Sequence, residues 1–341
     1  MARHPLGSHG GQRSWIYIIS ALLVIVVVVA LIYGLHPFSK NNKEEPGVAP
    51  PDINVPEANK TTSPKPKPVV ESEPNPPTIV PGPIGEPNEK VAELLLESMA
   101  SISTSPSRII EARDSLNKAM GMPMSAEQRA FVREQLSELA NKWLFSRTVF
   151  PNDTLCGSYT IKPGDQLQAI GEQFKVPYEL LMAINSINRP EVLQAGGTIK
   201  VINGPFHARI YRSAFTMDLY LQNTFVRSFR VGLGKPGRET PTGLWVVKPG
   251  DKLPSPQWKD PDTGRIYKPE DPDYPLGSRW IGLEGIAGAA KGRTGFAIHG
   301  TKEPTQIGTA GSRGCIRLHN GDVILVYNLL MPGFSQVEVM E

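Results

Sequence analysis

The chain has 341 residues, and its 36 Lys and Arg residues against 33 Asp and Glu residues give a formal net charge of +3. The length suggests two or three domains, and a hydrophobic content of 40% is enough to build globular cores. No basic tract with interleaved aromatic side chains occurs, so the composition argues against a nucleic-acid partner.

An uncharged apolar run, WIYIISALLVIVVVVALIYGL, occupies residues 15–35. As a helix rising about 1.5 Å per residue, it is long enough to cross a hydrocarbon core of about 30 Å. A cleaved signal peptide is the alternative, but its apolar region would be shorter and followed by a small-x-small site. The next residues, HPFSKNNKEE, offer no such site, so we predict a transmembrane helix.

The charges around this run favour one orientation. Arg3 and Arg13 precede it without any acidic residue, so the positive-inside rule favours a short cytoplasmic N-terminus over residues 1–14. We therefore predict a single-pass protein of the bacterial inner (cytoplasmic) membrane, with the later domains on the periplasmic, extracytoplasmic side.

Residues 36–87 are rich in proline, at roughly a quarter of the positions. Proline fixes φ and lacks a backbone donor, so this segment is predicted to be a disordered linker rather than part of a core. A Pro-rich partner motif is the alternative. A semi-extended chain at about 3.1 Å per residue would reach on the order of 100 Å from the membrane.

Three segments of residues 88–146 carry apolar side chains at a helical period. Ser125 and Gln128 form a capping-box pattern at the start of the third segment. The apolar face of that segment is expected to consist of Phe131, Leu139, Ala140 and Trp143. We predict a small all-α domain that acts as a spacer or docking unit.

Residues 159–202 read as a short strand, a Gly-Asp turn, two short helices, a Gly-containing turn and a second strand. The residues alone indicate a small βααβ module. The pattern resembles the LysM domain over its whole length, and we expect that domain to span residues 157–203. The matching positions are Tyr159, Ile161, Gly164, Asp165, Leu167, Ile170, Phe174, Val176, Leu180, Asn185, Leu193, Gly196, Ile199 and Val201.

The resemblance to LysM implies that this module binds glycan strands containing N-acetylglucosamine. The groove would lie between the loop after the first strand and the loop before the last. The implied contacts are Gly164, Asp165 and Gln166 on one side, with Ile187, Asn188 and Leu193 on the other. Judged from the residues alone, Gly164 and Asp165 are turn formers rather than ligands.

Residues 206–341 alternate in the manner of strands, with one helix expected at GDVILVYNLLM. Four blocks follow in order: TPTG at 240–243, PLGSRWIGL at 275–283, IHGT at 298–301 and SRGCIRL at 312–318. Together they resemble the L,D-transpeptidase catalytic domain of the YkuD family. The expected chain is thus multidomain and ends in a mostly-β catalytic domain.

Cys315 and His299 are the candidate nucleophile and base. A cysteine attacks an amide carbonyl at neutral pH when a histidine lowers the thiol pKa or takes its proton. The resemblance implies that His299 Nε2 faces the sulfur while its other ring nitrogen donates to the Gly300 carbonyl. Gly314 would allow close approach to the substrate, and Arg317 would organise the loop or pair with a substrate carboxylate.

The amides of Arg313, Gly314 and Cys315 are the expected oxyanion donors. Many members of the family carry histidine at the position of Arg313, so only its backbone is assigned a role. The loop at residues 248–277 is long and rich in Pro and Asp, and it is expected to form a lid or an acceptor-side element.

The resemblance implies a peptidoglycan tetrapeptide stem as substrate. The cysteine would be acylated by the L-centre of the third residue, often meso-diaminopimelate, with release of D-alanine. An amine of a second stem would then form a 3→3 cross-link, which contributes to cell-wall organisation and cell shape. Carbapenems would mimic the acyl donor. The alternatives are an L,D-carboxypeptidase and an inactive, LysM-containing structural protein.

Neither a metal nor another cofactor is expected. A zinc site from His299, Cys315 and His319 is the alternative for the histidine and the thiol, but no compact ligand pair of the usual spacing occurs. Cys156 has no nearby histidine or Gly-rich loop, which favours a bystander over a disulfide partner of Cys315.

Overall fold

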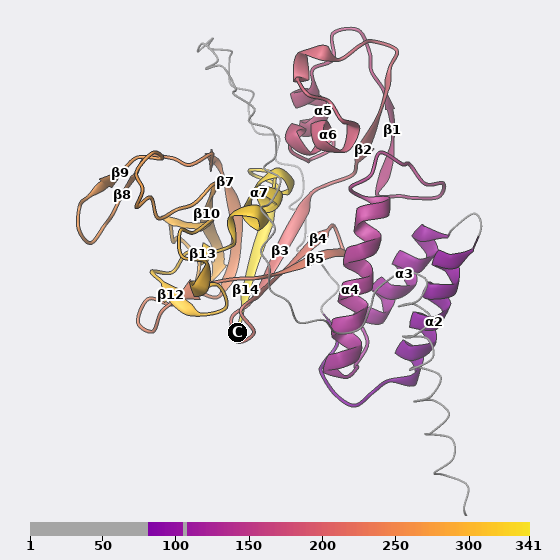
Figure 1. Ribbon diagram of the computed structural model, residues 1–341, viewed down its shortest axis with the longest axis horizontal. Coiled ribbons are helices and arrows are strands. Elements are labelled where there is room, and N and C mark those ends of the chain that lie inside the picture. Colours follow the sequence, from indigo (N-terminus) through magenta and orange to yellow (C-terminus); the bar gives the residue numbers. More distant parts are fainter. Residues whose placement is uncertain (1–80, 105–107) are drawn as a thin grey trace, which may run out of the picture. The chain divides into compact units, whose positions relative to one another are not determined.

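The computed structural model describes residues 81–104 and 108–341. The predicted cytoplasmic N-terminus, the transmembrane helix at 15–35 and most of the linker lie outside the described residues. No helix in the described part is both long and apolar enough to cross a membrane. Figure 1 shows the described helices and strands in the order of the chain.

The last residues of the predicted linker are ordered, so the prediction of disorder was wrong for 81–87. Gly82 N donates to Met120 O at 3.0 Å, and Gly85 N donates to Met124 O at 2.9 Å. The neighbouring prolines lack donors, but the glycines between them keep theirs and pair with the connection that follows α3.

The helical region consists of α2 (Glu89–Ser103), α3 (Ile109–Met120) and α4 (Ala126–Trp143). Asn88 caps α2, and the predicted capping box of Ser125 and Gln128 begins α4. Phe131 does not belong to the buried face of α4, because its side chain is 39% exposed. The buried stripe instead follows helical spacing through Val132, Leu136, Leu139 and Trp143, from which Phe131 is offset by one residue.

The βααβ module pairs β1 (Cys156–Thr160) antiparallel with β2 (Thr198–Ile202). Between the strands lie α5 (Leu167–Gln173), α6 (Tyr178–Asn185) and the short 3-10 helix η1 (Pro190–Val192). The side chain of Asn185 bonds Lys200 N at 2.8 Å and Lys200 O at 2.9 Å, which fixes α6 on β2. The predicted order of strands and helices is confirmed.

The C-terminal region is a mostly-β domain around an eight-stranded sheet in the order β13-β11-β10-β7-β14-β3-β4-β5. Its strands are β3 (Phe206–Tyr211), β4 (Thr216–Leu221), β5 (Thr224–Arg230), β7 (Gly243–Leu253), β10 (Trp280–Gly288), β11 (Phe296–His299), β13 (Ile316–Arg317) and β14 (Gln336–Met340). Smaller pairs are formed by β6 (Leu233–Gly234) with β12 (Ala310–Ser312), and by β8 (Trp258–Lys259) with β9 (Ile266–Tyr267).

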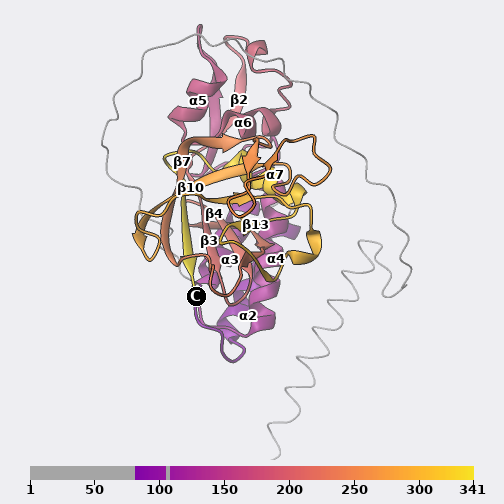
Figure 2. The same cartoon turned by 90° about the vertical axis from the view of Figure 1, so that its left-hand side faces the viewer.

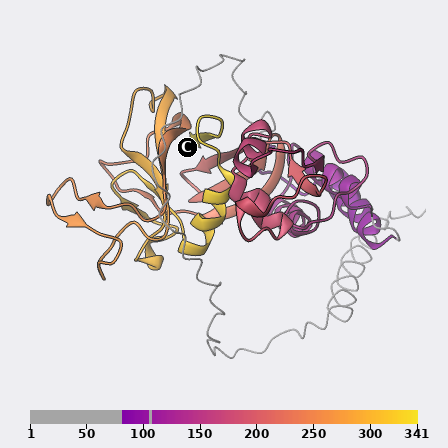
Figure 3. The ribbon, with the colours of Figure 1, turned by 90° about the horizontal axis from the view of Figure 1, so that it is seen from above.

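Two pairs in the large sheet are parallel, β11 with β13 and β14 with β3. The long strands β7 and β10 run antiparallel to each other (Figure 2). The predicted helix is present as α7 (Asn320–Leu329), and the 3-10 helix η2 (Pro304–Gln306) precedes the catalytic loop. α7 lies beside the sheet (Figure 3), where Val323, Val326 and Leu329 are fully buried.

The helical region packs on the edge of this sheet. Asn117 Oδ1 accepts from Phe225 N at 3.0 Å, so α3 covers a backbone donor of the edge strand β5. Arg133 of α4 pairs with Asp218, whose side chain is fully buried and also accepts from Ser228 Oγ at 2.7 Å. The helices therefore pack against the edge of the large sheet.

Lys200 links the βααβ module to the helical region. Its Nζ donates to the carbonyls of Trp143 at 2.5 Å, Ser146 at 2.9 Å and Thr148 at 2.8 Å. These carbonyls lie at and beyond the end of α4, where helical partners are missing. The lysine thus satisfies carbonyls that would otherwise be left without donors.

Candidate active site

The loop that carries Cys315 is held by hydroxyl groups on two sides. Ser312 Oγ accepts from Gly314 N at 3.0 Å and donates to the Cys315 carbonyl at 2.6 Å. Thr240 Oγ1 donates to the Gly314 carbonyl at 2.9 Å. Gly314 has φ +118, and a Cβ there would lie 2.7 Å from a ring carbon of Phe296, so the position requires glycine.

Cys315 is half-buried and lies directly before β13. Burial raises the pKa of its thiol, although a hydrogen bond from the Ala297 amide and the positive charge of Arg317 both favour the thiolate. The resting sulfur is therefore a neutral thiol that needs a base.

His299 ends β11, the strand that pairs in parallel with β13. Its Nδ1 lies 2.7 Å from the Gly300 carbonyl oxygen, and its ring stacks on Trp280 at 5.8 Å between centroids. A carbonyl accepts but does not donate, so this contact favours the tautomer with the proton on Nδ1 and leaves Nε2 as the basic nitrogen. The imidazole is thus carried by the strand that pairs with β13, which begins directly after Cys315.

The charge state of His299 follows from its surroundings. Burial lowers its pKa to about 4, and the nearby Arg317 guanidinium acts in the same direction, while the carbonyls of Gly300 and Leu276 oppose the shift. The side chain is only 4% exposed. At neutral pH the histidine is uncharged and able to accept a proton.

Asn320 holds the backbone around Gly300 and was not singled out from the sequence. Its Oδ1 accepts from Ser278 N and from Thr301 N, both at 3.2 Å, and its Nδ2 donates to the Thr301 carbonyl at 3.0 Å. A Cβ built on Gly300 would lie 2.2 Å from Asn320 Oδ1. The only signal in the sequence was a polar residue two positions after the SRGCIRL block, directly before the expected helix.

Arg317 is a half-buried guanidinium near the thiol. Burial lowers its pKa, against the charge of Glu303. One terminal nitrogen donates to Gln306 Oε1, whereas Nε is buried and has no hydrogen-bond partner among residues 81–104 and 108–341. A positive group is thus present beside the thiol, with one buried donor left unsatisfied in the described part of the chain.

The side chain of Arg313 binds the long loop rather than the catalytic pair. Its two terminal nitrogens donate to Asp260 at 3.1 and 3.2 Å, and its Nε lies 2.8 Å from Asp262 Oδ2. Arg238 also contacts Asp262 at 3.2 Å. The loop at 248–277, which includes β8 and β9, is therefore tied by charge to the catalytic loop.

The expected oxyanion donors differ in their availability, because the Gly314 amide is already bonded to Ser312 Oγ.

In the βααβ module, Gly164 has φ +86 and Asp165 Oδ2 accepts from Lys162 N at 2.8 Å and Tyr159 Oη at 2.9 Å. Both residues therefore shape the first turn, as their residue types indicated. The remaining contact candidates, Gln166 and Asn188 (exposed) and Ile187 and Leu193 (half-buried), lie on the two flanking loops.

Cys156 and Cys315 are both free thiols. Burial raises the pKa of Cys156 to about 12, so this thiol is unreactive at neutral pH. His319 is exposed, and the described part of the chain contains no group of three or more His, Cys, Asp or Glu side chains arranged to hold a metal ion.

Comparison with known proteins identifies two domains. Residues 205–339 match the L,D-transpeptidase catalytic domain of the YkuD family, and residues 159–201 match the LysM domain. The chain is 30% identical over 186 residues to the YkuD protein of Bacillus subtilis (strain 168), an L,D-transpeptidase by name, covering 52% of this chain and 94% of the relative.

Two further matches cover smaller fractions of this chain. The ErfK/SrfK protein of Escherichia coli (strain K12), also an L,D-transpeptidase by name, is 30% identical over 182 residues, half of each chain. The solved catalytic domain of an E. faecium L,D-transpeptidase is 20% identical, with a TM-score of 0.31, over 39% of this chain and 95% of that one. The extent of the match to the Bacillus protein, together with the two domain matches, shows that this chain belongs to the YkuD family of cysteine-dependent L,D-transpeptidases and carries a LysM peptidoglycan-binding domain.

Proposed function

We propose that this protein is a membrane-anchored L,D-transpeptidase that binds the cell wall and forms 3→3 cross-links between peptidoglycan stems. The proposal rests above all on the 2.7 Å contact between His299 Nδ1 and the Gly300 carbonyl, beside the loop of Cys315. That contact leaves the second ring nitrogen available as a base for the neutral thiol.

In the first half-reaction Cys315 Sγ attacks the L-centre carbonyl of the third stem residue while its proton passes to His299. The C–N bond to the terminal D-alanine then breaks, and His299 gives the proton to the departing amine. The product is a thioester on Cys315. His299, with its pKa lowered to about 4, begins this step uncharged and so is ready to accept the proton.

Negative charge develops on the attacked carbonyl oxygen, and the amides of Arg313 and Cys315 are the proposed donors to it. The Gly314 amide would join them only after giving up its bond to Ser312 Oγ. Arg317, whose positive charge acts on the thiol, would hold a carbonyl or carboxylate oxygen of the stem.

In the second half-reaction the amine of another stem attacks the thioester carbonyl. The C–S bond breaks, the amine loses a proton to the His299 base, and the sulfur regains one. The part of the long loop around Asp260, which is tied to Arg313, would shape the place where this second stem lies.

The remaining regions deliver the active site to its substrate. We propose that residues 15–35 anchor the chain in the cytoplasmic membrane, that the linker up to residue 80 spans the distance to the wall, and that residues 88–146 support the catalytic domain at 206–341. The LysM domain at 157–203 would hold a glycan strand through Gln166, Ile187, Asn188 and Leu193, with Gly164 and Asp165 forming the turn.

Acylation by a carbapenem tests the catalytic part of the proposal. Intact mass should rise by one adduct on the wild type and on Cys156→Ala, and should not change on Cys315→Ala. Failure of the wild type to acquire an adduct, under conditions that label the Bacillus relative, would favour an inactive wall-binding protein.

The reaction products separate cross-linking from hydrolysis. With tetrapeptide stems, mass spectrometry should detect a dimer that has lost one D-alanine; tripeptide alone would identify an L,D-carboxypeptidase.

Membrane anchoring is tested by fractionation of cells, in which Val27→Arg with Val28→Arg should release the protein from the membrane fraction.

A further inference from the structure

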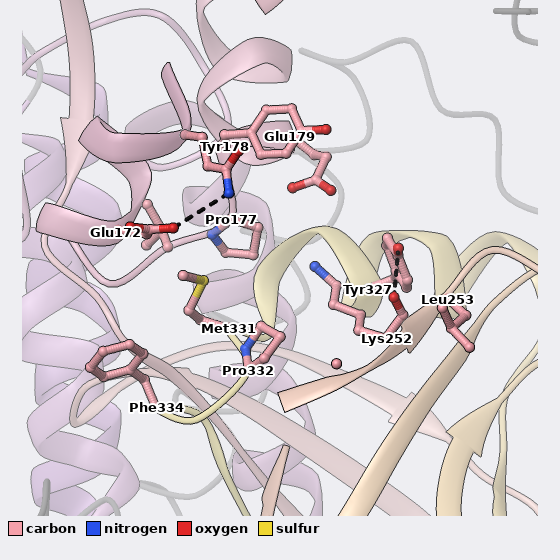
Figure 4. Close-up of a pocket in the computed structure, with 13 residues that line it drawn as sticks. Glu172, Pro177, Tyr178, Glu179, Lys252, Leu253, Tyr327, Met331, Pro332 and Phe334 are labelled. Carbon is pink, nitrogen blue, oxygen red and sulfur yellow. Dashed lines mark hydrogen bonds between the residues drawn. The ribbon is translucent and has the colours of Figure 1, made fainter. Parts of the chain in front are cut away.

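A cleft of about 680 Å³ lies between the LysM domain and the catalytic domain. One wall is formed by α5 and the start of α6, including Glu172, Tyr178 and Glu179, and the other by the end of β7 with α7 and the turn that follows it. Figure 4 shows Lys252, Tyr327, Met331, Pro332 and Phe334 on the second side. The cleft is open to solvent, and neither Cys315 nor His299 lines it.

Lys252 supplies an unpaired positive charge to this cleft. Its Nζ lies 4.2 Å from the centroid of the Tyr327 ring, and the residue forms no ion pair within the described part of the chain. Burial lowers its pKa to about 8, with Arg279 acting in the same direction and Glu179 opposing. A partly desolvated ammonium group that forms no ion pair with a described residue is a binding position for an anion.

Negative charge stands on the opposite wall. Glu172 is exposed and accepts only a long hydrogen bond, 3.4 Å, from Gln168, and Glu179 is half-buried. Neither carboxylate forms an ion pair with a described residue. Tyr178 and Phe334 add aromatic surface to the lining of the cleft (Figure 4). The cleft therefore complements a ligand that carries both a carboxylate and an ammonium group on a partly apolar body.

The cleft and the catalytic pair are connected by the register of the sheet. Leu253, at the edge of the cleft, pairs with Trp280, and Trp280 pairs with His299 and stacks on its ring. Two strand spacings separate the backbones of Leu253 and His299, which is about 10 Å. A ligand in the cleft therefore lies within the reach of one stem peptide from the active site, since four extended residues span about 13 Å.

We propose that this cleft is a second peptidoglycan site, which binds the peptide stem of the wall by its carboxylate at Lys252 and its free amine at Glu172 and Glu179. The identity of the ligand rests on the proposed function, whereas the charge arrangement does not. Binding there would keep a stem beside the active site while LysM holds the same glycan strand.

Calorimetry on the full chain with Cys315→Ala tests this site without turnover. The probe is a free tetrapeptide stem with meso-diaminopimelate at its third position. Lys252→Met should lower the affinity of one class of binding site for the stem by roughly tenfold or more, because a charged hydrogen bond is lost. Lys248→Met, on the same strand but paired with Asp251 at 3.8 Å and outside the cleft, is the matched control and should leave the isotherm unchanged.

A second probe examines the opposite wall. The double variant Glu172→Gln with Glu179→Gln should weaken the binding of the stem that has a free amine. It should not weaken the binding of the stem whose amine is acetylated. If Lys252→Met and Lys248→Met give the same isotherm while both retain the unfolding temperature of the parent, the cleft is not a stem site. Should Lys252→Met unfold, Lys252→Arg, which keeps the charge, must bind like the parent for the proposal to stand.

These outcomes are independent of the catalytic proposal. An adduct of a carbapenem on the wild-type chain reports on Cys315 alone. A chain that is acylated but shows no dependence on Lys252 would reject the cleft and leave the transpeptidase assignment intact.

Discussion

Arg313 binds Asp260 with both terminal nitrogens, at 3.1 and 3.2 Å, across 53 positions of the sequence. The arginine lies two residues before the nucleophile, and the aspartate lies in the long loop that follows β7. A charged contact therefore sets where that loop stands relative to Cys315.

Replacing Asp260 by Asn should loosen the loop. The amide oxygen can still accept from Asp262 N and Thr263 N, so the local turn is kept while the charge facing Arg313 is lost. Hydrogen exchange of residues 258–267 should become several-fold faster. Because salt screens the ion pair, the exchange rate of the wild type at high salt should approach that of the variant. Glu270→Gln, on the same loop but without an ion pair in the described chain, is the control, and equal exchange in the two variants would contradict the role of the contact.

The dependence of acylation on pH should follow the lowered pKa of His299. Because that pKa is about 4, the base is already deprotonated at pH 5.5, and the rate should be nearly flat from about pH 5.5 to 8 and fall below about pH 5. His299→Asn should be slower by roughly 10²-fold. Stopped-flow rates of carbapenem acylation measure this dependence. A rise in rate centred at about pH 6.5, the ordinary pKa of histidine, would show that burial does not shift the pKa of His299.

Gly300→Ala should damage catalysis although its backbone is not in the left-handed region. The added Cβ would meet Asn320 Oδ1 at 2.2 Å and Ser278 N at 3.0 Å, so the carbonyl that holds His299 must move. A displacement of about 1 Å costs on the order of 10²-fold in rate. Gly321→Ala is a matched control, because its Cβ meets nothing within 4 Å, and acylation by Gly300→Ala at the control rate would reject this argument.

Lys200→Met should destabilise the protein far more than removal of a surface lysine. The methionine leaves the carbonyls of Trp143, Ser146 and Thr148 without their donor, at a cost of roughly 3 kcal/mol in the free energy of unfolding. Thermal unfolding of Lys200→Met and of Lys142→Met, an exposed position of α4, provides the measurement. Indistinguishable transitions would mean that water replaces the ammonium group.

Features encoded by neighbouring residues could be predicted from the sequence. The capping box of Ser125 and Gln128 and the turn at Gly164 and Asp165 depend on contacts a few positions apart, so local pattern was sufficient. His299 and Cys315 were found because they stand in blocks that resemble a known family. Phe131 was misplaced because a weakly amphipathic helix allows two neighbouring choices of face, and only packing decides between them.

The supports of the site could not be predicted in this way. Thr240 reaches the Gly314 carbonyl across 74 positions, and Asn320 reaches Ser278 across 42. Ser312 was visible in the motif, but its hydroxyl occupies the Gly314 amide that had been expected to stabilise the oxyanion. Such contacts depend on which strands become neighbours, and a single sequence carries no local signal for that.

The strand β14 also determines how mechanical tension would pass through the protein. It is the central link of the large sheet, parallel to β3 on one side and antiparallel to β7 on the other. The docked helices belong to the β3 side, and His299 with Cys315 belongs to the β7 side. A pull between the docked helices and a group bonded to Cys315 would therefore have to pass through the backbone hydrogen bonds that join β14 to β3 and β7.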